Sequence, residues 1–330
     1  MSGFWDGKRV FVTGATGVLG YWLTNELCKQ RADTIVLVRD FDPQSFLIKS
    51  RLSEKTTIVS GELEDFNTLE RAINEYEVEY IFHLGAQTIV GTSYRNPLAT
   101  FESNIRGTYQ LLEACRRHKD FIKGIIIASS DKAYGPSEKL PYTEDMPLRG
   151  MYPYDVSKSC ADLIASSYFH TYGLPVVITR CGNLFGGGDL NWSRLIPGTI
   201  RSFFLGNSPE IRSDGHFTRD YLFVKDAVHA YLLLASQIQQ KTLHGETFNF
   251  GPNRPYSVLE IAKSIQTLME CSDIALNIKN SANHEIRHQS LNSDKARRLL
   301  GWVPQFSLEE GLELTIDWYK KILEEQLATV

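Results

Sequence analysis

Short runs of apolar residues alternate with amphipathic segments along the first 180 residues of the chain. Runs without polar alternation are typical of strands buried on both faces, so we predict strands at residues 9–13, 34–38, 56–60, 80–84, 124–129 and 175–180. Helical periodicity predicts helices from Gly20 to Lys29 and near residues 66–76, 97–118 and 154–172. This repeated strand–helix order indicates an α/β fold with a doubly wound parallel sheet.

The pattern becomes irregular after Arg180. One further strand is predicted at residues 247–250, and amphipathic helices are predicted at residues 257–269 and 308–324. Ser257 and Glu260 have the spacing of a capping box at the start of the first of these helices. We therefore expect a smaller, mixed C-terminal domain that lies over the carboxyl edge of the sheet, where such folds bind their ligands.

Composition narrows the classes of function. The chain has 330 residues, of which 42% are hydrophobic, so it can bury a large core. A net charge of −4 without a basic stripe argues against a nucleic-acid partner, and no apolar stretch is long enough to span a membrane. The first eight residues lack the apolar run of a secretory signal, and the five cysteines are scattered. We expect a cytoplasmic protein with free thiols and no metal site.

A glycine motif joins the first strand to the first helix. Gly14, Gly17 and Gly20 have the spacing that lets a backbone turn tightly against a pyrophosphate, while the helix N-terminus offers free N–H groups. Since the motif lies between a strand and a helix, it predicts a dinucleotide site. The expected contacts are Gly14, Thr16, Gly17, Val18, Leu19 and Gly20.

Residues after the next strands complete the predicted dinucleotide site. Asp40 would bind the ribose hydroxyls of NAD, and Arg39 would favour the 2′-phosphate of NADP, so both cofactors are possible, with NAD preferred. Glu62 and Leu63 are expected beside the adenine. Leu84 and Ala86 are expected along the cofactor, whereas His83 is interpreted as a core residue.

A tyrosine and a lysine four residues apart predict a reaction centre. Tyr154 and Lys158 share one face of a helix, where the ammonium can lower the pKa of the phenol from its usual value of about 10. Ser130, at the end of the fifth strand, is followed by Asp131 and Lys132. This pair adds an acid and a second ionisable group beside the redox centre.

Several motifs in the same order resemble the extended short-chain dehydrogenase/reductases that act on nucleotide sugars. The resemblance covers nearly the whole chain and rests on the following segments: Gly14-x-x-Gly17-x-x-Gly20, Asn104, Ser130, Tyr154-x-x-x-Lys158, Arg180-x-x-Asn183-x-x-Gly186, Arg194-Leu195-Ile196-Pro197, Arg219-Asp220-Tyr221 and Leu300-Gly301-Trp302-x-Pro304. Asp131-Lys132 is similar to the pair found in CDP-glucose 4,6-dehydratases. Ala133-Tyr134-Gly135 and the Arg219 segment are more similar to general epimerase/dehydratase sequences than to the CDP-glucose type, and an NDP-sugar epimerase of the same family is the alternative.

The resemblance implies a role for each candidate residue. Tyr154 would take the proton of the sugar C4 hydroxyl, Lys158 would assist Tyr154 and contact the nicotinamide ribose, and Ser130 would bind the C4 oxygen. Asp131 would protonate the leaving C6 hydroxyl. Lys132 would either take the C5 proton as a neutral amine or stabilise the enolate as a cation. Asn104 would order a water or a carbonyl near Lys158, and a nucleotide diphosphate sugar would be bound by Gln87, Asn183, Arg194, Arg219 and Arg287.

The resemblance also implies how the chain is divided and assembled. An NAD(P)-binding Rossmann domain is expected at residues 1–180 plus about 222–252, and a nucleotide-sugar-binding domain at residues 181–221 and 253–330. The helices near residues 97–118 and 154–172 carry apolar faces, which in such relatives pair across a two-fold axis. We therefore expect a homodimer built on a four-helix bundle.

Overall fold

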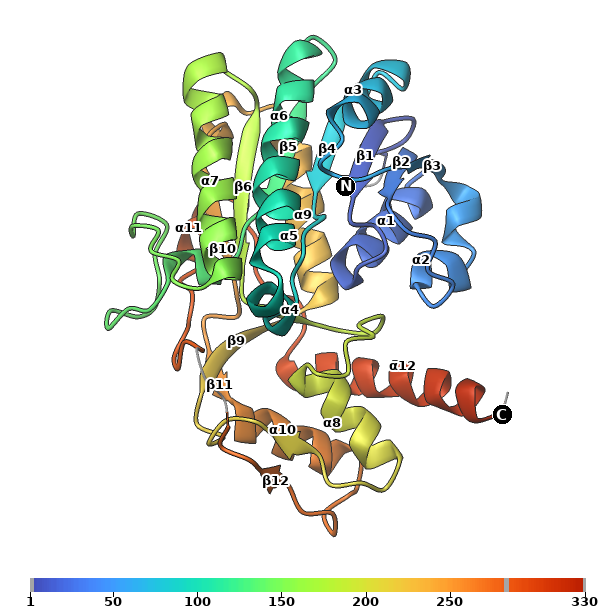
Figure 1. Cartoon of the computed structure of the whole chain (residues 1–330), viewed down its shortest axis with the longest axis vertical. Coiled ribbons are helices and arrows are strands. Elements are labelled where there is room, and N and C mark those ends of the chain that lie inside the picture. The colour runs from blue at the N-terminus through green and yellow to red at the C-terminus, as the bar shows by residue number, and fades with distance from the viewer. Residues whose placement is uncertain (1–2, 282–284, 329–330) are drawn as a thin grey trace.

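The computed structural model describes residues 3–281 and 285–328, so the first two residues of the segment considered above as a signal lie outside it. Its centre is a seven-stranded sheet with the strand order β10-β6-β5-β4-β1-β2-β3 (Figure 1). All neighbouring strands in this sheet are parallel. The strands are Arg9–Thr13 (β1), Asp33–Val38 (β2), Thr57–Ser60 (β3), Tyr80–His83 (β4), Gly124–Ala128 (β5), Val176–Cys181 (β6) and Thr247–Phe250 (β10).

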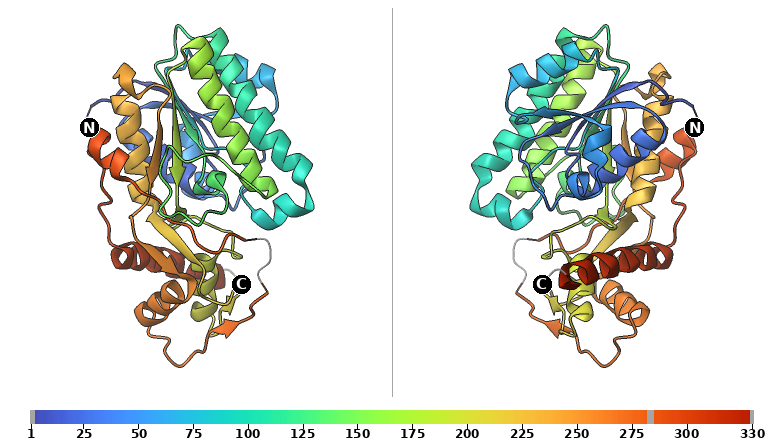
Figure 2. Two further views of the ribbon diagram at one scale, coloured as in Figure 1. Left: turned by 90° about the vertical axis from the view of Figure 1, so that its left-hand side faces the viewer. Right: turned by 90° about the vertical axis from the view of Figure 1, so that its right-hand side faces the viewer.

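Helices cover both faces of this sheet, as the apolar strands require. Val10 and Val12 belong to the core cluster on one face, and Phe11 between them belongs to the cluster on the other. Helices α1 and α9 pack on the first face, and α3, α6 and α7 on the second (Figures 1 and 2). These helices are Val18–Lys29 (α1), Phe66–Glu75 (α3), Gly107–Arg117 (α6), Pro153–Tyr172 (α7) and Val224–Gln237 (α9). The predicted doubly wound α/β fold is confirmed.

The helix predicted near residues 97–118 is not a single regular helix. It is divided into α5 (Pro97–Phe101), a π-helical segment η2 (Glu102–Arg106) and α6. A π-helical turn holds one residue more than an α-helical turn, which shifts the side chains that follow it around the axis. Here the wider turn contains the buried Asn104.

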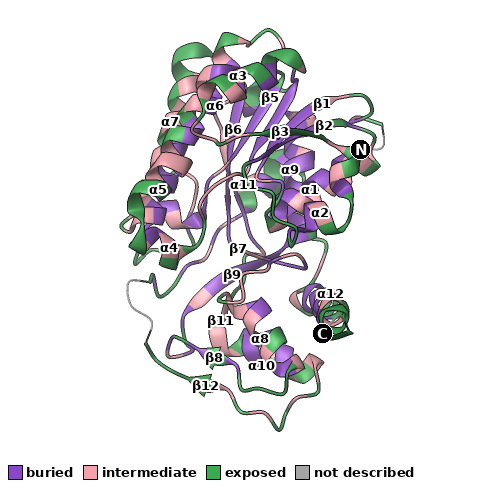
Figure 3. Cartoon of the chain, turned by 45° about the vertical axis from the view of Figure 1, so that its right-hand side comes forward, coloured by how far each residue is buried: buried purple, intermediate pink, exposed green. Residues whose placement is uncertain are grey.

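The second part of the chain is smaller and mixed, as predicted. Its three-stranded sheet has the order β11-β9-β7, with β7 parallel and β11 antiparallel to β9. The strands are Asn183–Phe185 (β7), Thr218–Phe223 (β9) and Pro255–Ser257 (β11), and a separate pair is formed by Glu210–Ile211 (β8) and Asn277–Ile278 (β12). Helices α8 (Leu195–Phe204), α10 (Val258–Leu268) and α12 (Leu308–Ala328) pack around these strands (Figure 3). The capping box of Ser257 and Glu260 at the start of α10 is confirmed.

Short helical turns complete the described chain: Phe46–Lys49 (α2), Leu52–Lys55 (η1), Val90–Arg95 (α4), Asp131–Tyr134 (η3), Lys241–Leu243 (η4) and Asp294–Leu300 (α11). Within residues 3–281 and 285–328, no helix has both the length and the apolarity needed to cross a bilayer. After β7, β9 and their surrounding loops, the chain returns through α9 to place β10 beside β6 at the edge of the large sheet.

Candidate active site

The candidate residues gather at one edge of the large sheet. The glycine turn follows β1, the Arg39-Asp40 pair follows β2, Leu84 follows β4, and Ser130 with its neighbours follows β5. Because these strands are parallel, their carboxyl ends meet at the same edge, and the smaller domain lies beyond that edge (Figure 1).

The three glycines of the turn have different surroundings. Gly14 has φ +78°, and a Cβ there would lie 2.7 Å from the backbone nitrogen of Gly85. A Cβ at Gly20 would lie 2.0 Å from the Gly14 oxygen. At Gly17, by contrast, the nearest atom to an added Cβ is the Gly14 oxygen at 3.4 Å. Gly14 and Gly20 therefore close the turn, whereas Gly17 faces open space.

This open space lies at the N-terminus of α1. Gly17 is the N-cap residue, and no side chain caps the helix there, so the N–H groups of the first turn are available to an anion. Thr16 is exposed at the rim, Val18 is half-buried and Leu19 is buried. The turn thus fits the pyrophosphate of a dinucleotide.

The other dinucleotide candidates line the same edge. Arg39 and Asp40 are exposed and form an ion pair with each other, with Nε 2.6 Å from Oδ2. Glu62 is exposed and Leu63 is half-buried, where the Leu63 side chain packs against Gly85 and Gly107. Leu84 and Ala86 are half-buried in the loop after β4. In this structure the carboxylate expected to bind ribose is therefore held by its neighbouring guanidinium.

His83 is buried beneath this edge in a hydrogen-bond network. Its Nδ1 lies 2.8 Å from Oγ1 of Thr13, and its Nε2 lies 3.1 Å from Oγ1 of Thr108. Burial, assisted by the charge of Lys158, lowers the pKa of His83 to about 3. His83 is therefore neutral at physiological pH, which agrees with its interpretation as a core residue.

Asn104, in the π-helical turn, ties the loop after β4 to helix α7. Its Oδ1 accepts a hydrogen bond of 2.7 Å from the backbone nitrogen of Gln87. Its Nδ2 donates to the backbone oxygen of Gln87 at 3.0 Å and to Oγ of Ser157 at 2.9 Å. The structure thus brings together two predicted residues, Asn104 and Gln87. Asn104 also contacts Ser157, the residue before Lys158.

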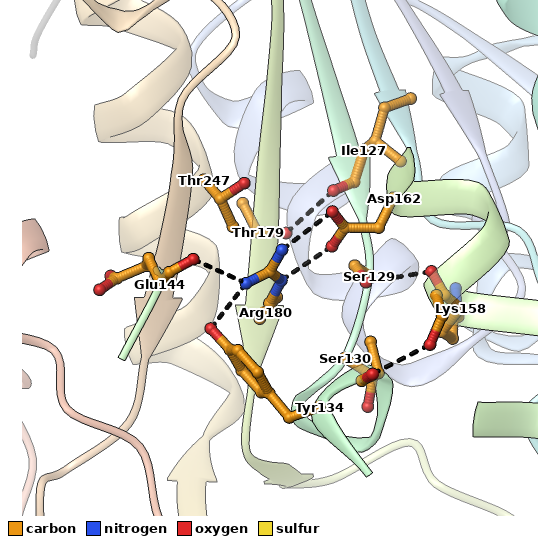
Figure 4. A network of polar contacts seen from close by, with 12 residues as sticks. Ile127, Ser129, Ser130, Tyr134, Glu144, Lys158, Asp162, Thr179, Arg180 and Thr247 are labelled. Carbon is orange, nitrogen blue, oxygen red and sulfur yellow. Dashed lines mark hydrogen bonds and ion pairs between the residues drawn. The ribbon is translucent and has the colours of Figure 1, made fainter. Parts of the chain in front are cut away.

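Tyr154 and Lys158 are both buried on α7, and Ser130 lies beside them. The Nζ of Lys158 donates a hydrogen bond of 2.8 Å to the backbone oxygen of Ala128. Figure 4 shows that Oγ of Ser129 donates a hydrogen bond to the backbone oxygen of Lys158. Burial lowers the pKa of Lys158 to about 8. Burial raises the pKa of Tyr154 to about 12, and hydrogen bonding with Ser130 opposes this rise. The predicted group of three residues is therefore assembled.

Asp131 and Lys132 lie in the turn η3 next to this group. Asp131 is only 3% exposed, its Oδ1 accepts a hydrogen bond of 3.0 Å from Oγ of Ser130, and burial raises its pKa. Lys132 Nζ donates to Oε1 of Gln289 at 3.1 Å. Burial, followed by the charge of Arg219, lowers the pKa of Lys132. The site thus places a carboxyl group and an amine, each with its neutral form favoured by burial, beside Tyr154.

A buried ion pair supports this wall of the site (Figure 4). Arg180 on β6 bonds both carboxylate oxygens of Asp162 on α7, at 2.8 and 2.9 Å. Its Nη1 also donates to the hydroxyl of Tyr134 at 2.7 Å, and that hydroxyl bonds Oδ1 of Asn249 at 2.8 Å. The pair therefore joins α7, β6, η3 and β10 around the reacting residues.

Arg194 is the substrate candidate best placed at the edge of the site. It is the N-cap residue of α8 and is half-buried. Its Nη1 donates to Oδ2 of Asp189 at 2.7 Å, and its Nη2 donates to Oγ1 of Thr88 at 3.2 Å. Asn183 begins β7 and is half-buried. Arg194 thus spans from the smaller domain to the loop after β4.

Two other substrate candidates, Arg219 and Arg287, bond to other groups of the protein in this structure. Arg219 is 5% exposed, and its two Nη atoms donate to the backbone oxygens of Thr218, Ile286 and Arg287. Arg287 is exposed and donates to Oδ2 of Asp214 at 2.9 Å. The structure therefore uses Arg219 to hold the segment at residues 286–287, while its charge also acts on Asp131 and Lys132.

Sequence reasoning missed three residues of the site. Asp155 follows Tyr154, is buried, and has its pKa raised to about 6 by burial. Its place inside the Tyr-x-x-x-Lys motif could have indicated it. Asp189, the partner of Arg194, directly follows the three glycines at residues 186–188. Gln289 had no local signal, since it reaches Lys132 from 157 residues away.

Comparison with known proteins points to one family. The family described as GDP-mannose 4,6 dehydratase matches residues 11–315 of the chain. The CDP-glucose 4,6-dehydratase of Salmonella typhimurium is 33% identical, and the match covers 96% of this chain and 92% of that protein.

Solved structures of similar fold include both dehydratases and epimerases. A dTDP-glucose 4,6-dehydratase from Bacillus anthracis in complex with NAD has a TM-score of 0.83 and 28% identity, covering 96% of this chain and 98% of that one. A UDP-glucose 4-epimerase from Thermotoga maritima with UDP-glucose has a TM-score of 0.86 and 28% identity, covering 96% and 99%. With a match to the family over most of its length and the same motifs assembled at one edge of the sheet, the chain belongs to the GDP-mannose 4,6 dehydratase family.

Proposed function

We propose that this protein is a nucleotide-sugar 4,6-dehydratase that converts an NDP-hexose of the CDP-glucose kind to the NDP-4-keto-6-deoxyhexose. The observation that carries the proposal is Asp131, a buried carboxyl group beside Ser130 whose pKa is raised by burial. A carboxyl group that keeps its proton can donate that proton to a leaving hydroxyl, which an epimerase does not require. The similarity to the Salmonella CDP-glucose 4,6-dehydratase supports the same reaction.

NAD is the cofactor that the glycine turn fits. The open space at Gly17 and the uncapped N-terminus of α1 suit its pyrophosphate, and Asp40 suits its ribose once it is released from Arg39. When bound, NAD supplies the redox chemistry: it accepts hydrogen with its electron pair from C4 of the hexose and later returns it to C6. The protein must therefore hold both C4 and C6 of the hexose close to the position of the nicotinamide ring.

In the first half of the reaction, Tyr154 acts as the base. Its phenolate takes the proton of the C4 hydroxyl, and Ser130 hydrogen-bonds the C4 oxygen. The pKa of about 12 makes Tyr154 a poor base until positive charge lies nearby. Lys158 on the same helix supplies such charge in its protonated form.

In the second half, Asp131 acts as the acid. The C4 ketone acidifies the C5 proton, and loss of that proton pushes out the C6 hydroxyl, which leaves as water with the proton of Asp131. Lys132 assists in one of two ways: its neutral amine takes the C5 proton, or its ammonium stabilises the enolate. At the end of the cycle, the proton that Tyr154 took from the C4 hydroxyl is passed to Asp131, so both side chains regain their starting protonation states.

The substrate diphosphate is assigned to the side of the site that faces the smaller domain. Arg194 offers a planar guanidinium that can bind phosphate oxygens in pairs, in exchange for its bond to Asp189. Asn183 and Gln87 complete the proposed contacts. On this basis, residues 1–180 with about 222–252 bind NAD, and residues 181–221 with 253–330 bind the nucleotide sugar.

We also propose that the protein is a cytoplasmic homodimer assembled through α5, α6 and α7. These helices lie side by side, and large apolar side chains are exposed on them: Leu98 (69%), Tyr109 (39%), Leu163 (61%) and Tyr172 (51%). A second copy would remove these side chains from water in a four-helix bundle. Light scattering during size-exclusion chromatography should give twice the mass of the chain, and Leu163→Glu should give the mass of one chain.

The test of the reaction is incubation of the NAD-loaded protein with a panel of NDP-hexoses, followed by mass spectrometry. The expected product is lighter than its substrate by one water, and no reduced nicotinamide accumulates. Products of unchanged mass would instead support an NDP-sugar epimerase, which the likeness to the Thermotoga epimerase keeps as the second candidate. Absence of any product from a folded, NAD-loaded sample would count against both.

A further inference from the structure

Lys132 is held by one side chain that comes from a distant part of the chain. The only hydrogen bond of its Nζ among the described residues is the 3.1 Å bond to Oε1 of Gln289. Gln289 is completely buried, and its own backbone nitrogen donates to the Thr218 oxygen at 3.1 Å, next to the isolated bridge between Thr218 and His288. Its position is therefore fixed by β9 rather than by Lys132.

The acceptor on Gln289 is a neutral amide, although charged groups surround Lys132. Asp131 on its own turn, Asp155 on α7 and Glu285 favour the ammonium, while Arg219 on β9 disfavours it. Burial is the largest influence and also disfavours the ammonium. An amide oxygen can accept a hydrogen bond from the amine without adding a negative charge, whereas a carboxylate at the same place would stabilise the charged form strongly.

The other end of the Gln289 amide, Nε2, lies in a poorly bonded position. It is buried and makes no hydrogen bond of normal geometry among the described residues, although the Gln289 side chain interacts with the phenol of Tyr142 and opposes the rise that burial imposes on the pKa of that phenol. A buried donor without a well-formed hydrogen bond costs free energy, so the amide at residue 289 is not explained by the packing of this end alone. The oxygen end of the same amide contacts Lys132, a candidate reacting group.

We propose that Gln289 is a positioning residue for Lys132: it fixes the amine beside Asp131 without locking a proton on it. The inference rests on the proposed dehydratase function, and it selects between the two roles left open for Lys132. The lone pair of the neutral amine takes the C5 proton, the electrons of that C–H bond form the C5–C6 double bond, and the C6–O bond breaks with the proton of Asp131. The ammonium then returns its proton to C5 when C6 is reduced, so the amine is regenerated.

The first test measures Lys132 itself and needs no substrate. The protein is labelled with trace acetic anhydride over a range of pH, and the acetylation of each lysine is followed by peptide mass spectrometry. Gln289→Glu places a carboxylate against the amine, so the midpoint for Lys132 should rise by about one to three pH units. Gln289→Met removes the acceptor that supports the ammonium, so the midpoint should fall.

His288→Gln is the matched control, because His288 is the exposed neighbour of Gln289 and should leave the Lys132 midpoint unchanged. A merely structural role for Gln289 would alter the melting temperature but would not move the two midpoints in opposite directions. An unchanged midpoint in either folded Gln289 variant would overturn the proposal.

The second test uses turnover. If Lys132 is the base, the rise of kcat with pH should move to higher pH in Gln289→Glu, in parallel with the labelling midpoint. A kcat that instead increases at neutral pH in this variant would overturn the neutral-amine role. The two failures are distinguishable, because shifted midpoints without water loss from any NDP-hexose would leave the contact with Lys132 standing and reject the dehydratase function.

Discussion

The hydroxyl of Ser130 donates a hydrogen bond of 3.0 Å to Oδ1 of Asp131, in a place where the carboxyl group is only 3% exposed. Because burial raises the pKa of Asp131, Asp131→Asn removes a proton donor with little change of shape. We expect this variant to lose water from the substrate about 10²–10⁴-fold more slowly while C4 oxidation continues. Reduced-nicotinamide absorbance should then accumulate. The exposed Glu138→Gln is the control, and an Asp131→Asn enzyme that dehydrates at the normal rate would exclude Asp131 as the acid.

Two glycines of the turn, Gly17 and Gly14, should affect protein stability and cofactor binding differently. Gly17→Ala meets no close neighbour, so the protein should fold normally but bind NAD roughly tenfold or more weakly, a change of about 1.4 kcal/mol. Gly14→Ala forces a Cβ to 2.7 Å from the Gly85 nitrogen at φ +78° and should lower the melting temperature as well. Calorimetry of unfolding and of NAD binding checks both. Equal losses of stability in the two variants would contradict this division.

NAD should change the ionisation of Tyr154. In the protein alone, burial raises the pKa of this phenol to about 12. The positively charged nicotinamide ring favours a nearby phenolate, so the pKa should fall when NAD binds. Alkaline titration of phenolate absorbance in the wild type minus Tyr154→Phe, with and without NAD, measures the change. A Tyr154 titration that is the same in both states would argue against its role as the base.

The Arg180–Asp162 pair should matter more for stability than any surface pair. Both side chains are about 5% exposed or less, so Asp162→Ala leaves a buried, unpaired guanidinium and should cost about 3–5 kcal/mol of unfolding free energy. The exposed pair of Arg71 and Glu75 on α3 is the control, and Glu75→Ala should cost only about 0.3–0.5 kcal/mol. Urea unfolding compares the two variants, and similar losses of unfolding free energy would contradict the supporting role of Arg180.

His83 should make the protein sensitive to mild acid. Burial lowers its pKa to about 3, whereas in an unfolded chain it is about 6.5. Between these values the unfolded state binds more protons, so the unfolding free energy due to His83 is complete above pH 6.5 and decreases as pH falls, by up to about 1.4 kcal/mol per pH unit. His83→Gln should therefore show a shallower loss of stability from neutral pH to pH 4.5. Parallel slopes for the two proteins would contradict this.

Much of the large sheet was predictable because its strands are buried on both faces. The runs at residues 9–13 and 124–129 stand out from polar surroundings, and the structure places β1 and β5 there within a residue. Strand β9 and helix α9 were not predicted, since Thr218–Phe223 continues into Val224–Gln237 without an intervening turn residue. The π-helical turn around Asn104 was also missed, because a single wider turn has no distinct residue signature in the sequence.

The site was predictable where chemistry lies in short segments. The glycine turn and the Tyr154–Lys158 pair are each local, and the structure assembles them with Ser130 at one edge. Arg219 shows what local segments leave out. The family resemblance predicts it as a substrate ligand, and this stays a prediction. No local pattern connects it to the backbone oxygens of residues 286 and 287, to which it donates.

Strand β10 pairs with β6, yet about one fifth of the chain, including β7, α8 and β9, is inserted between them. The large sheet consequently cannot be completed during synthesis until the inserted segment, residues 182–246, has emerged from the ribosome. Until then β6, whose six residues are all buried in the finished protein, is a bare apolar edge open to pairing with other chains. A fragment that stops at residue 181 should accordingly aggregate, because β10, which completes this edge of the sheet, is missing from it.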